Sequence, residues 1–215
     1  MKYSIDPSLY DAWYHTNKGK WIGNIEFTLL MKLLRPLARQ SLLDVGCGTG
    51  YFSQRFSDIG LRVTGIDQDM AMLQVAKSKN TKVNYIQANA YRLPFDNKTF
   101  DYCSAITSLC FIHEPQAVLK EMWRVSRKGI ILGLLNRSSL LHLLKRNSQR
   151  YKGARWDTSR EIREWCKKIA ANPQISLHTA VWCPIDNSIC RLVENILPDK
   201  FNYGGFIALY LMKEN

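Results

Sequence analysis

The chain has 215 residues and a mass of 24.9 kDa, which suits one domain with a small appended segment. Apolar residues make up 46% and charged residues 22%, so the chain can bury a core, and a largely disordered protein is excluded. Thirty Lys and Arg residues against 18 Asp and Glu give a formal charge of +12. This surplus favours anionic partners without choosing among nucleic acid, a membrane surface and acidic small molecules.

No stretch of the sequence is long and apolar enough to predict a transmembrane helix, and the first residues lack the apolar core of a signal peptide. We therefore expect a cytoplasmic protein. No Cys-x-x-Cys pair is present, so no metal site is expected. The cysteines are interpreted as reduced, mostly buried thiols, at positions 47, 103, 110, 166, 183 and 190.

Short apolar runs alternate with helical patterns, which is typical of a parallel sheet covered by helices on both faces. A helix is expected over 24–34, and later helices over 51–57, from the N-cap Asp69 onward, over 116–125, and over 162–171 behind the capping box Thr158-Ser-Arg-Glu161. Strands are expected at 41–45, 61–66, 83–86, 101–106 and 130–135, with a turn over 127–129. Two late runs, 175–182 and 206–212, are expected to pair as an antiparallel edge.

The strongest motif is Asp44-Val-Gly46-Cys-Gly48-Thr-Gly50, a buried strand that runs into a glycine-rich loop. Its third glycine comes one residue too early for the dinucleotide fingerprint, and no Gly-Lys-Ser/Thr follows, so a P-loop is excluded. An acid at this strand end suits a ligand with an ammonium group. A second acid, Asp67, ends the next apolar run, where its carboxylate can accept hydrogen bonds from ribose hydroxyls. A ligand with an amino acid at one end and a nucleoside at the other fits both acids.

These residues, together with Gly65-Ile-Asp67, Gln87-Ala-Asn-Ala-Tyr-Arg-Leu-Pro-Phe95 and Phe100-Asp-Tyr-Cys-Ser-Ala105, resemble the class I S-adenosylmethionine-dependent methyltransferases, and more narrowly the small type 11-like group. The resemblance covers residues 40–135 strongly and the flanks only by layout. It implies a doubly wound, mostly parallel seven-stranded α/β sheet with an N-terminal helical cap and a lid insertion.

The resemblance also implies S-adenosylmethionine as cofactor and S-adenosylhomocysteine as product. Asp44 would act near the ammonium group, the glycine loop along the methionine part, Asp67 at the ribose, and residues 68, 89 and 90 at the adenine. Position 89 is Asn where the family usually has Asp, and we expect its oxygen still to accept from the adenine amino group. The residues expected to hold the cofactor are Asp44, Gly46, Cys47, Gly48, Gly50, Asp67, Gln68, Asn89, Ala90, Ile106 and Thr107.

On the acceptor side no catalytic residue is identified. His113, just after the fourth strand, is a weak candidate for a general base, against the simpler interpretation of a loop histidine beside Glu114. Aromatic residues of the N-terminal segment either stack on the acceptor or only dock that segment on the core. The substrate-side candidates are Tyr10, Trp13, Tyr14 and Phe111.

The positive charge is concentrated in one segment. Residues 124–168 hold 13 Lys and Arg against 3 Asp and Glu, so this stretch carries nearly the whole surplus. We expect one domain over 1–215, divided into a cap (1–38), a cofactor-binding core (39–135), a basic lid segment (136–172) and C-terminal strands (173–215). The basic stretch is either a solvated helical face or a surface for substrate, nucleic acid or membrane.

The sequence predicts an S-adenosylmethionine-dependent methyltransferase that acts on an unidentified acceptor, for which we expect a small molecule, as a monomer or homodimer. Two alternatives stay open. One is an RNA methyltransferase that uses the basic 124–168 segment. The other is a non-catalytic protein that binds S-adenosylmethionine and regulates a partner.

Overall fold

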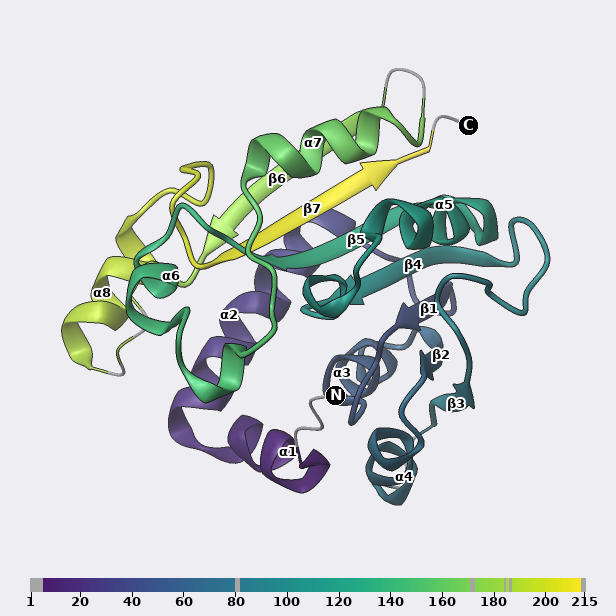
Figure 1. Ribbon diagram of the computed structural model, residues 1–215, viewed down its shortest axis with the longest axis horizontal. Helices are drawn as coiled ribbons and strands as arrows, with labels where there is room; N and C mark the ends of the chain where they lie inside the picture. Colours follow the sequence, from purple (N-terminus) through teal and green to yellow (C-terminus); the bar gives the residue numbers. More distant parts are fainter. Residues whose placement is uncertain (1–5, 80–81, 171–172, 184, 186, 214–215) are drawn as a thin grey trace.

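The computed structural model describes residues 6–79, 82–170, 173–183, 185 and 187–213. Within this part of the chain a seven-stranded sheet has the order β3-β2-β1-β4-β5-β7-β6 (Figure 1). All neighbours are parallel except β7, which is antiparallel to both β5 and β6. The strands are β1 (Ser41–Val45), β2 (Arg62–Asp67), β3 (Asn84–Gln87), β4 (Phe100–Ile106), β5 (Ser126–Leu135), β6 (Gln174–Ala180) and β7 (Phe206–Met212).

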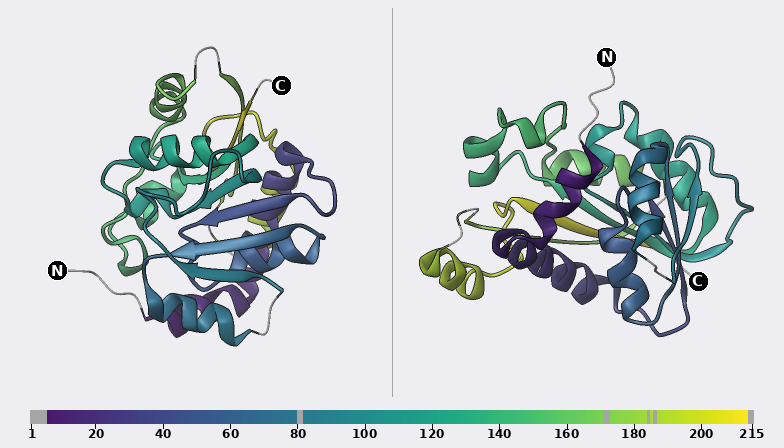
Figure 2. Two further views of the ribbon diagram at one scale, coloured as in Figure 1. Left: turned by 90° about the vertical axis from the view of Figure 1, so that its right-hand side faces the viewer. Right: turned by 90° about the horizontal axis from the view of Figure 1, so that it is seen from below.

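Helices cover both faces of this sheet, as the alternating pattern predicts (Figure 2). Two layers result, with α5 and α7 on one face and α2, α3 and α4 on the other. The helices are α1 (Pro7–His15), α2 (Asn17–Leu34), α3 (Tyr51–Asp58), α4 (Met70–Ser78), α5 (Pro115–Val125), α6 (Leu140–Lys145), α7 (Ser159–Lys167) and α8 (Ser188–Ile196), with short 3₁₀ turns η1 (Leu109–Phe111) and η2 (Gln149–Tyr151).

Alternation along β1 shows how the two cores arise. Leu42 packs in the core under α2, α3 and α4, whereas Leu43 and Val45 pack in the core under α5 and α7. Successive side chains of a strand point to opposite faces, and a parallel sheet is buried on both. Asp44 shares the face of Leu42, so the strand's one carboxylate lies against α3.

The predicted strands and the doubly wound order are confirmed, and strand boundaries differ from the predicted ones by at most four residues. The two late strands pair antiparallel as expected, and β7 lies between β5 and β6. The expected turn over 127–129 is wrong, because α5 runs directly into β5 at Ser126. Helix α2 begins at Asn17 rather than at 24, with Thr16 as its N-cap. The capping box of Thr158 and Glu161 is confirmed, but the helix behind it covers Ser159–Lys167.

Helix α8, between β6 and β7, carries no pattern that we recognised in the sequence. It lies in a segment where a disulfide joins Cys183 to Cys190, whose Cα atoms are 5.2 Å apart. The expectation of reduced thiols is therefore wrong for this pair, because sequence spacing does not reveal such proximity. Cys47, Cys103, Cys110 and Cys166 are free.

The segment after β5 divides into two parts with different surroundings. Residues 136–156 leave the sheet, pass through α6 and η2, and return toward α7 (Figure 1). Helix α7 buries Ile162 and Cys166 in the core beside α5, so it is part of the covering layer of the sheet. Of the expected lid segment, residues 136–156 thus lie outside the layer that α7 joins, and we refer to these residues as the lid segment, or lid.

The core under α5 offers a direct test of this packing. Met122 is fully buried against the sheet, whereas Lys120 on the same helix is exposed. We expect Met122→Ala to lower the free energy of unfolding by about 2–5 kcal/mol, because it removes buried methylene groups and leaves a cavity. Lys120→Ala should change it by no more than about 0.5 kcal/mol. Urea unfolding of the two variants measures the difference, and equal losses would contradict this placement of α5.

Candidate active site

The glycine loop after β1 has positive φ angles, which residues other than glycine rarely adopt. Gly46, Gly48 and Gly50 have φ angles of 69°, 54° and 78°. The backbone N–H groups of Gly46 and Cys47 both donate to the carbonyl of Ile66 at the end of β2, at 2.8 and 2.9 Å. A Cβ on Gly46 would lie 2.5 Å from the Cβ of Ser108, so the loop needs glycine there for space as well as for conformation.

Asp67 ties this loop to the end of β2. One carboxylate oxygen accepts the N–H of Gly48 at 2.8 Å, and the other accepts the N–H of Asp69 at 2.9 Å. Each oxygen of an ionised carboxylate has a second lone pair, so both can still accept from a ligand. Asp69 in turn caps α4 by accepting from the N–H of Ala71. The carboxylate is thus held in place by backbone N–H groups that follow the carboxyl ends of β1 and β2.

Asp44 is a buried carboxylate at the inner wall of the site, with 2% of its surface exposed. The hydroxyls of Ser53 and Ser104 donate to its two oxygens at 2.6 and 2.7 Å. Burial raises the pKa of Asp44 to about 6; the two serine hydrogen bonds oppose this shift and the Asp67 charge adds to it. A cationic group placed beside Asp44 would therefore gain a strong electrostatic partner.

Residues 68–91 form the side of the site where the adenine was expected. The side-chain amide of Gln68 donates to the oxygen of Asn89 at 3.0 Å, and the N–H of Tyr91 donates to the same oxygen at 2.9 Å. Both lone pairs of that oxygen are occupied, which argues against the expected role of Asn89 as the acceptor for an adenine amino group. The amide donors of Asn89 and the backbone beside Ala90 remain for that contact.

A cavity of about 720 Å³ lies over these residues, at the carboxyl ends of the parallel strands. Its size is that of a pocket for a small ligand or cofactor. It brings together most of the residues expected from the sequence, namely Tyr10, Tyr14, Asp44, Gly46, Cys47, Gly48, Asp67, Gln68, Ala90, Ile106, Thr107, Phe111 and His113.

Three expected residues do not line this cavity. Gly50 begins α3 and faces Tyr85, whose hydroxyl would lie 2.2 Å from a Cβ on that glycine. Asn89 and Trp13 also lie outside, although Trp13 lines a second cavity nearby. The sequence reasoning missed other lining residues, including Thr49, Tyr51, Tyr91, Ser108, Lys152 and Gly153. Adjacency to the motifs was an available signal for the first four, whereas Lys152 and Gly153 arrive only through the fold of the lid.

Thr107, at the end of β4, lies where two cavities meet. Its φ of 51° is unusual for a β-branched residue. The surrounding backbone holds it there, because its N–H donates to the carbonyl of Gly133 at 2.7 Å and its own carbonyl accepts from the thiol of Cys110 at 3.1 Å. Strain of this kind is often retained at ligand sites, where it directs the chain toward the ligand.

Helix α1 lies over the glycine loop and covers one side of the site. A Cβ on Gly48 would lie 3.9 Å from the ring of Tyr10, so this ring covers the glycine loop. Asp11 forms an ion pair with Lys79 at the end of α4, and Lys79 also donates to the carbonyl of Thr49 at 2.8 Å. Burial opposes ionisation of Asp11, but the hydrogen bond from Lys79 and the Lys79 charge lower the pKa of Asp11 overall. Tyr14 stacks on Tyr51 at 3.8 Å between ring centroids.

A smaller cavity of about 70 Å³ adjoins the first one, between α1, α2 and the lid. Tyr10, Tyr14, Thr107 and Phe111 line both cavities, so the two are neighbours across these four residues. Its remaining wall comes from Trp13, Ile22, Glu26, Cys110, Leu135, Leu141, Tyr151, Val181 and Gly205.

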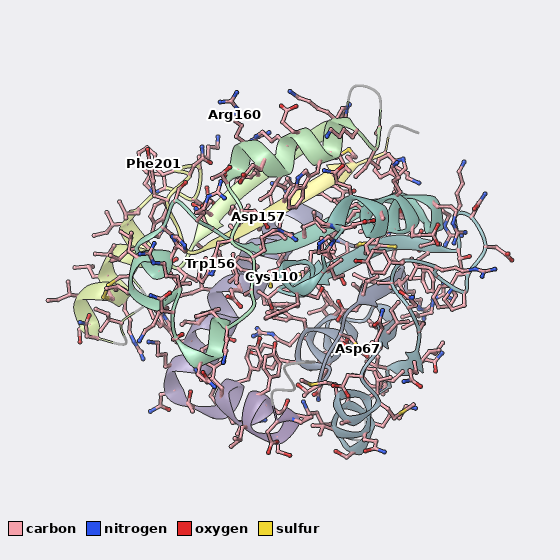
Figure 3. The ribbon with its side chains drawn as sticks, viewed as in Figure 1. Asp67, Cys110, Trp156, Asp157, Arg160 and Phe201 are labelled. Atoms are coloured by element: carbon pink, nitrogen blue, oxygen red, sulfur yellow. A yellow bond between two sulfur atoms is a disulfide. The ribbon has the colours of Figure 1, made fainter. Side chains whose placement is uncertain are left out.

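Arg155 fastens the lid to the body of the protein. Its guanidinium donates to the carbonyls of Ile112 and Leu109 at 2.7 and 3.1 Å and pairs with Asp157 at 2.7 Å. Its N–H also donates to the carbonyl of Cys110. Trp156 belongs with Cys110 to a small cluster of buried residues, and Figure 3 labels the two side chains close to each other. The base of the lid is therefore well held, and Lys152 and Gly153 reach the larger cavity from it.

His113 is exposed and lines the larger cavity. Among the described residues, no group of three or more His, Cys, Asp or Glu side chains is arranged to bind a metal ion. In the same part of the chain, no helix has the length and apolar character needed to cross a membrane.

Comparison with known proteins adds to this geometry. A family model described as a methyltransferase domain matches residues 43–133. An uncharacterized protein of Methanocaldococcus jannaschii is 28% identical over 207 residues, which cover 93% of each chain. The demethylmenaquinone methyltransferase of Renibacterium salmoninarum is 37% identical over 101 residues, 47% of this chain and 43% of that enzyme. The chain thus spans less than half the length of this named relative.

Among solved structures, a Thermotoga maritima protein described as an S-adenosylmethionine-dependent methyltransferase, possible histamine N-methyltransferase, superposes with a TM-score of 0.77. It is 22% identical, and the match covers 96% of this chain and 95% of that one. This likeness extends the shared fold beyond residues 43–133, to the helices and strands on both flanks.

The buried Asp44 makes a prediction about stability. The raised pKa means that the folded protein keeps this proton up to about pH 6, whereas the unfolded chain releases it near pH 4. Raising the pH from 4 to 7 without ligand should therefore lower the contribution of Asp44 to the free energy of unfolding, by up to about 3 kcal/mol. Asp44→Asn removes this titration.

Urea unfolding at several pH values between 4 and 7 tests this expectation. The stability of the wild type minus that of Asp44→Asn should fall as the pH rises. Asp58→Asn, at the exposed end of α3, is the control. The stability of the wild type minus that of Asp58→Asn should stay nearly constant over this pH range. A difference for Asp44→Asn that stays constant or grows with pH would show that burial does not raise this pKa.

Proposed function

We propose that the chain is a class I S-adenosylmethionine-dependent methyltransferase, which transfers the methyl group of S-adenosylmethionine to a small-molecule acceptor. The observation that carries this proposal is the pair of adjoining cavities, which share Tyr10, Tyr14, Thr107 and Phe111. The larger cavity has the size and the acids for the cofactor. The smaller one lies beneath α1 and the lid, where an extended macromolecule has little access.

The residues of the larger cavity fit the cofactor. Asp67 holds two backbone N–H groups and keeps acceptor capacity for two ribose hydroxyls. Asp44 supplies a carboxylate near the glycine loop for the ammonium group, directly or through water. Gly46 and Gly48 leave the loop backbone open to the methionine part. When bound, the cofactor supplies an activated methyl group on a positively charged sulfur.

The chain's own residues have three tasks in such a transfer. The loop and the two acids orient the donor, the shared wall around Thr107 aligns the acceptor with it, and α1 with the lid excludes water. The ion pair of Asp11 with Lys79 holds α1 over the site. Because the leaving group is already activated, alignment supplies most of the rate, and a general base is needed only when the nucleophile arrives protonated.

Two observations favour a small acceptor over RNA. The demethylmenaquinone methyltransferase among the relatives is named for a small acceptor. Within the basic 124–168 segment, Arg124, Arg137, Arg155 and Lys167 are each paired with a carboxylate, which reduces the charge available for phosphates. Release of S-adenosylhomocysteine in the presence of an acceptor would distinguish a small-molecule or RNA methyltransferase from a non-catalytic regulatory protein.

The experiment that tests the proposal is a screen for S-adenosylhomocysteine release. Purified protein and S-adenosylmethionine are incubated with either the small-molecule fraction or the RNA fraction of a cell extract, and the methylated product is identified by mass spectrometry. Release with the small-molecule fraction alone is expected. Release only with RNA, or cofactor binding without release in either fraction, would overturn the proposal.

Asp67→Ala tests the cofactor site. We expect it to weaken S-adenosylmethionine binding by about 1.5–3 kcal/mol, because a charged hydrogen-bond acceptor for the ribose is lost. Asp67→Asn keeps one acceptor oxygen and should lose less. Calorimetry measures the affinities, with the exposed Asp58→Ala as control. Unchanged affinity in a folded Asp67→Ala protein would remove Asp67 from the ribose site.

His113→Ala tests whether that histidine is a base. Because His113 is an exposed residue at the mouth of the cavity, we expect the variant to keep most of the activity with an identified acceptor. The shape of the profile across about pH 5–9 should not change. A loss above about a hundredfold, together with disappearance of a limb near pH 6–7, would instead identify His113 as the general base.

A further inference from the structure

Large apolar side chains are exposed at one end of the molecule. Seventeen large apolar residues of the described chain are exposed, and ten of them fall within 140–144 and 185–203. The first stretch belongs to α6, and the second contains α8 and the segment that leads into β7. The sheet places both at the same end, because Leu135 at the end of β5 and Ala180 at the end of β6 both pair with Phe206 at the start of β7 (Figure 1). We call the exposed apolar residues of these two stretches the α6–α8 face.

Helix α8 is held with its apolar side outward. Ile189, Leu192 and Ile196 lie three and four residues apart, on one side of the helix, and each has more than half of its surface exposed. On the other side, the two carboxylate oxygens of Glu194 accept the N–H groups of the two residues that follow β6, at 2.7 and 2.8 Å. The disulfide through Cys190 ties the first turn to the same segment. A surface helix normally turns its apolar side to the core and its charges to water, so α8 has the reverse orientation.

Helix α6 repeats this arrangement on a smaller scale. Leu141 is buried and lines the smaller cavity, whereas Leu140, Leu143 and Leu144 are exposed. The side chain of Ser139 caps the first turn, which fixes the start of the helix. Two helices at the start of β7 thus present leucine and isoleucine side chains to the outside. Exposed apolar residues that gather in one place in this way mark an interaction surface.

The charged residues around the α6–α8 face are mainly basic. Residues 136–156, which include α6, contain six Lys and Arg residues and no Asp or Glu. Lys145 and Arg146 follow the exposed leucines directly and are themselves exposed. The acids in α8 and in the segment after it, Glu194 and Asp199, bind groups of the protein, respectively the backbone after β6 and a lysine of α2. This face therefore combines apolar side chains with positive charge.

This combination favours a lipid surface over the other occupants of an exposed apolar face. A second copy of the chain, bound through the same face, would bring two basic surfaces together, and like charges repel. A purely apolar surface of another protein would offer no anionic group to Lys145 and Arg146. An anionic bilayer offers both kinds of contact, because helices that lie in a membrane interface place apolar residues at the acyl chains and Lys and Arg at the headgroups.

We propose that the α6–α8 face binds the surface of an anionic lipid bilayer. Its exposed leucine and isoleucine side chains enter the boundary of the acyl chains, and Lys145 and Arg146 contact headgroup phosphates. The inference goes beyond the proposed function and does not depend on it, because this face lies outside the donor site. Leu141, Val181 and Gly205 of the same segments line the smaller cavity, so the bound bilayer lies next to the wall of that cavity.

Co-sedimentation of the full chain with vesicles tests the binding, without any cofactor present. The vesicles contain either phosphatidylcholine alone or phosphatidylcholine and phosphatidylglycerol in equal parts. At low salt we expect the mixed vesicles to bind the protein about tenfold or more tightly than the neutral ones. Added salt should weaken this binding, because it screens the headgroup charges. Absence of binding to the mixed vesicles, or equal binding to both kinds, would overturn the proposal.

Substitution of apolar residues tests the face against a matched control. Leu143→Asn with Ile189→Asn changes one residue on each helix, which are 69 and 72% exposed. The control, Leu9→Asn with Leu37→Asn, changes two residues outside the face that are each 71% exposed. The first pair should weaken binding to the mixed vesicles by about tenfold or more, and the control pair by no more than about twofold, because only the first pair loses contact with the acyl chains. Equal losses in the two variants would contradict the proposal.

Substitution of basic residues separates a local contact from attraction by the charge of the whole protein. Lys145→Gln with Arg146→Gln removes two positive charges beside the face. Lys77→Gln with Lys120→Gln removes the same charge from exposed positions of α4 and α5. We expect the first pair to weaken binding to the mixed vesicles by about tenfold or more, and the second by less than about threefold. Equal weakening would exclude this face as the docking surface, and the comparison serves even if the apolar variant does not fold.

Sedimentation equilibrium without lipid tests a second copy of the chain as the occupant. We expect the wild type and the variant Leu143→Asn with Ile189→Asn to have the same oligomeric state. A dimer of the wild type that this variant abolishes would assign the face to a second copy and overturn the proposal. Because vesicle binding is measured without cofactor and acceptor, its failure and the failure of the proposed methyl transfer are separate results.

Discussion

The site depends on one set of hydrogen bonds, which joins the glycine loop to the end of the neighbouring strand. The N–H groups of Gly46 and Cys47 donate to the carbonyl of Ile66, and that of Gly48 donates to the carboxylate of Asp67. These contacts require β1 and β2 to be parallel and adjacent, because only then do both strand ends reach the same edge of the sheet. They also require positive φ angles, which explains the glycines.

Two carboxylates lie near these hydrogen bonds, in different environments. One carboxylate, Asp67, stays at the rim and is held by backbone N–H groups. Another, Asp44, is buried behind the loop, where two serine hydroxyls are its only polar neighbours among the hydrogen bonds we find. Burial destabilises its ionised form in the free protein and makes the same group a strong partner for a cation. The buried carboxylate of Asp44 thus lowers the free energy of unfolding of the ligand-free protein and, at the same time, favours binding of a cationic ligand.

Two segments that flank strands β1 to β5 in the sequence, α1 and the lid, cover the site. Helix α1 comes from before the first strand, and the lid comes from after the fifth, and both bring aromatic rings to Thr107. Each cover is fastened by an ion pair at its base, Asp11 with Lys79 for the helix and Arg155 with Asp157 for the lid. These fastenings place the covers without filling the cavities beneath them. The walls of the smaller cavity thus come largely from these covers and from α2, which lie outside the segment that carries the family motifs.

Much of the fold and of the donor site could be predicted from the sequence, because the signals are local. The apolar runs predict strands, Asp69 and the pair Thr158 and Glu161 predict helix starts, and the order of strand, glycine loop and helix predicts that Asp44 and Asp67 meet. Each of these depends on residues within a few positions of one another, or on the regular geometry of a parallel sheet. The misplaced turn at 127–129 and the unrecognised α8 lie where the local pattern is weak or mixed.

Tertiary structure alone decided the rest. The oxygen of Asn89 is occupied because Gln68, 21 residues away, turns toward it. Glu26 of α2 lines the same cavity as Thr107 and Leu141, and no periodicity in the sequence distinguishes such a position from a solvated one. Lys152 lines the larger cavity because Arg155, three residues later, is hydrogen-bonded to the carbonyl of Leu109 in η1. The sequence by itself thus determined the fold and the kind of ligand that the first strand binds, since these follow from local backbone requirements. The wall of the smaller cavity was decided by side chains brought together from distant segments, and their contacts exist only in the packed structure.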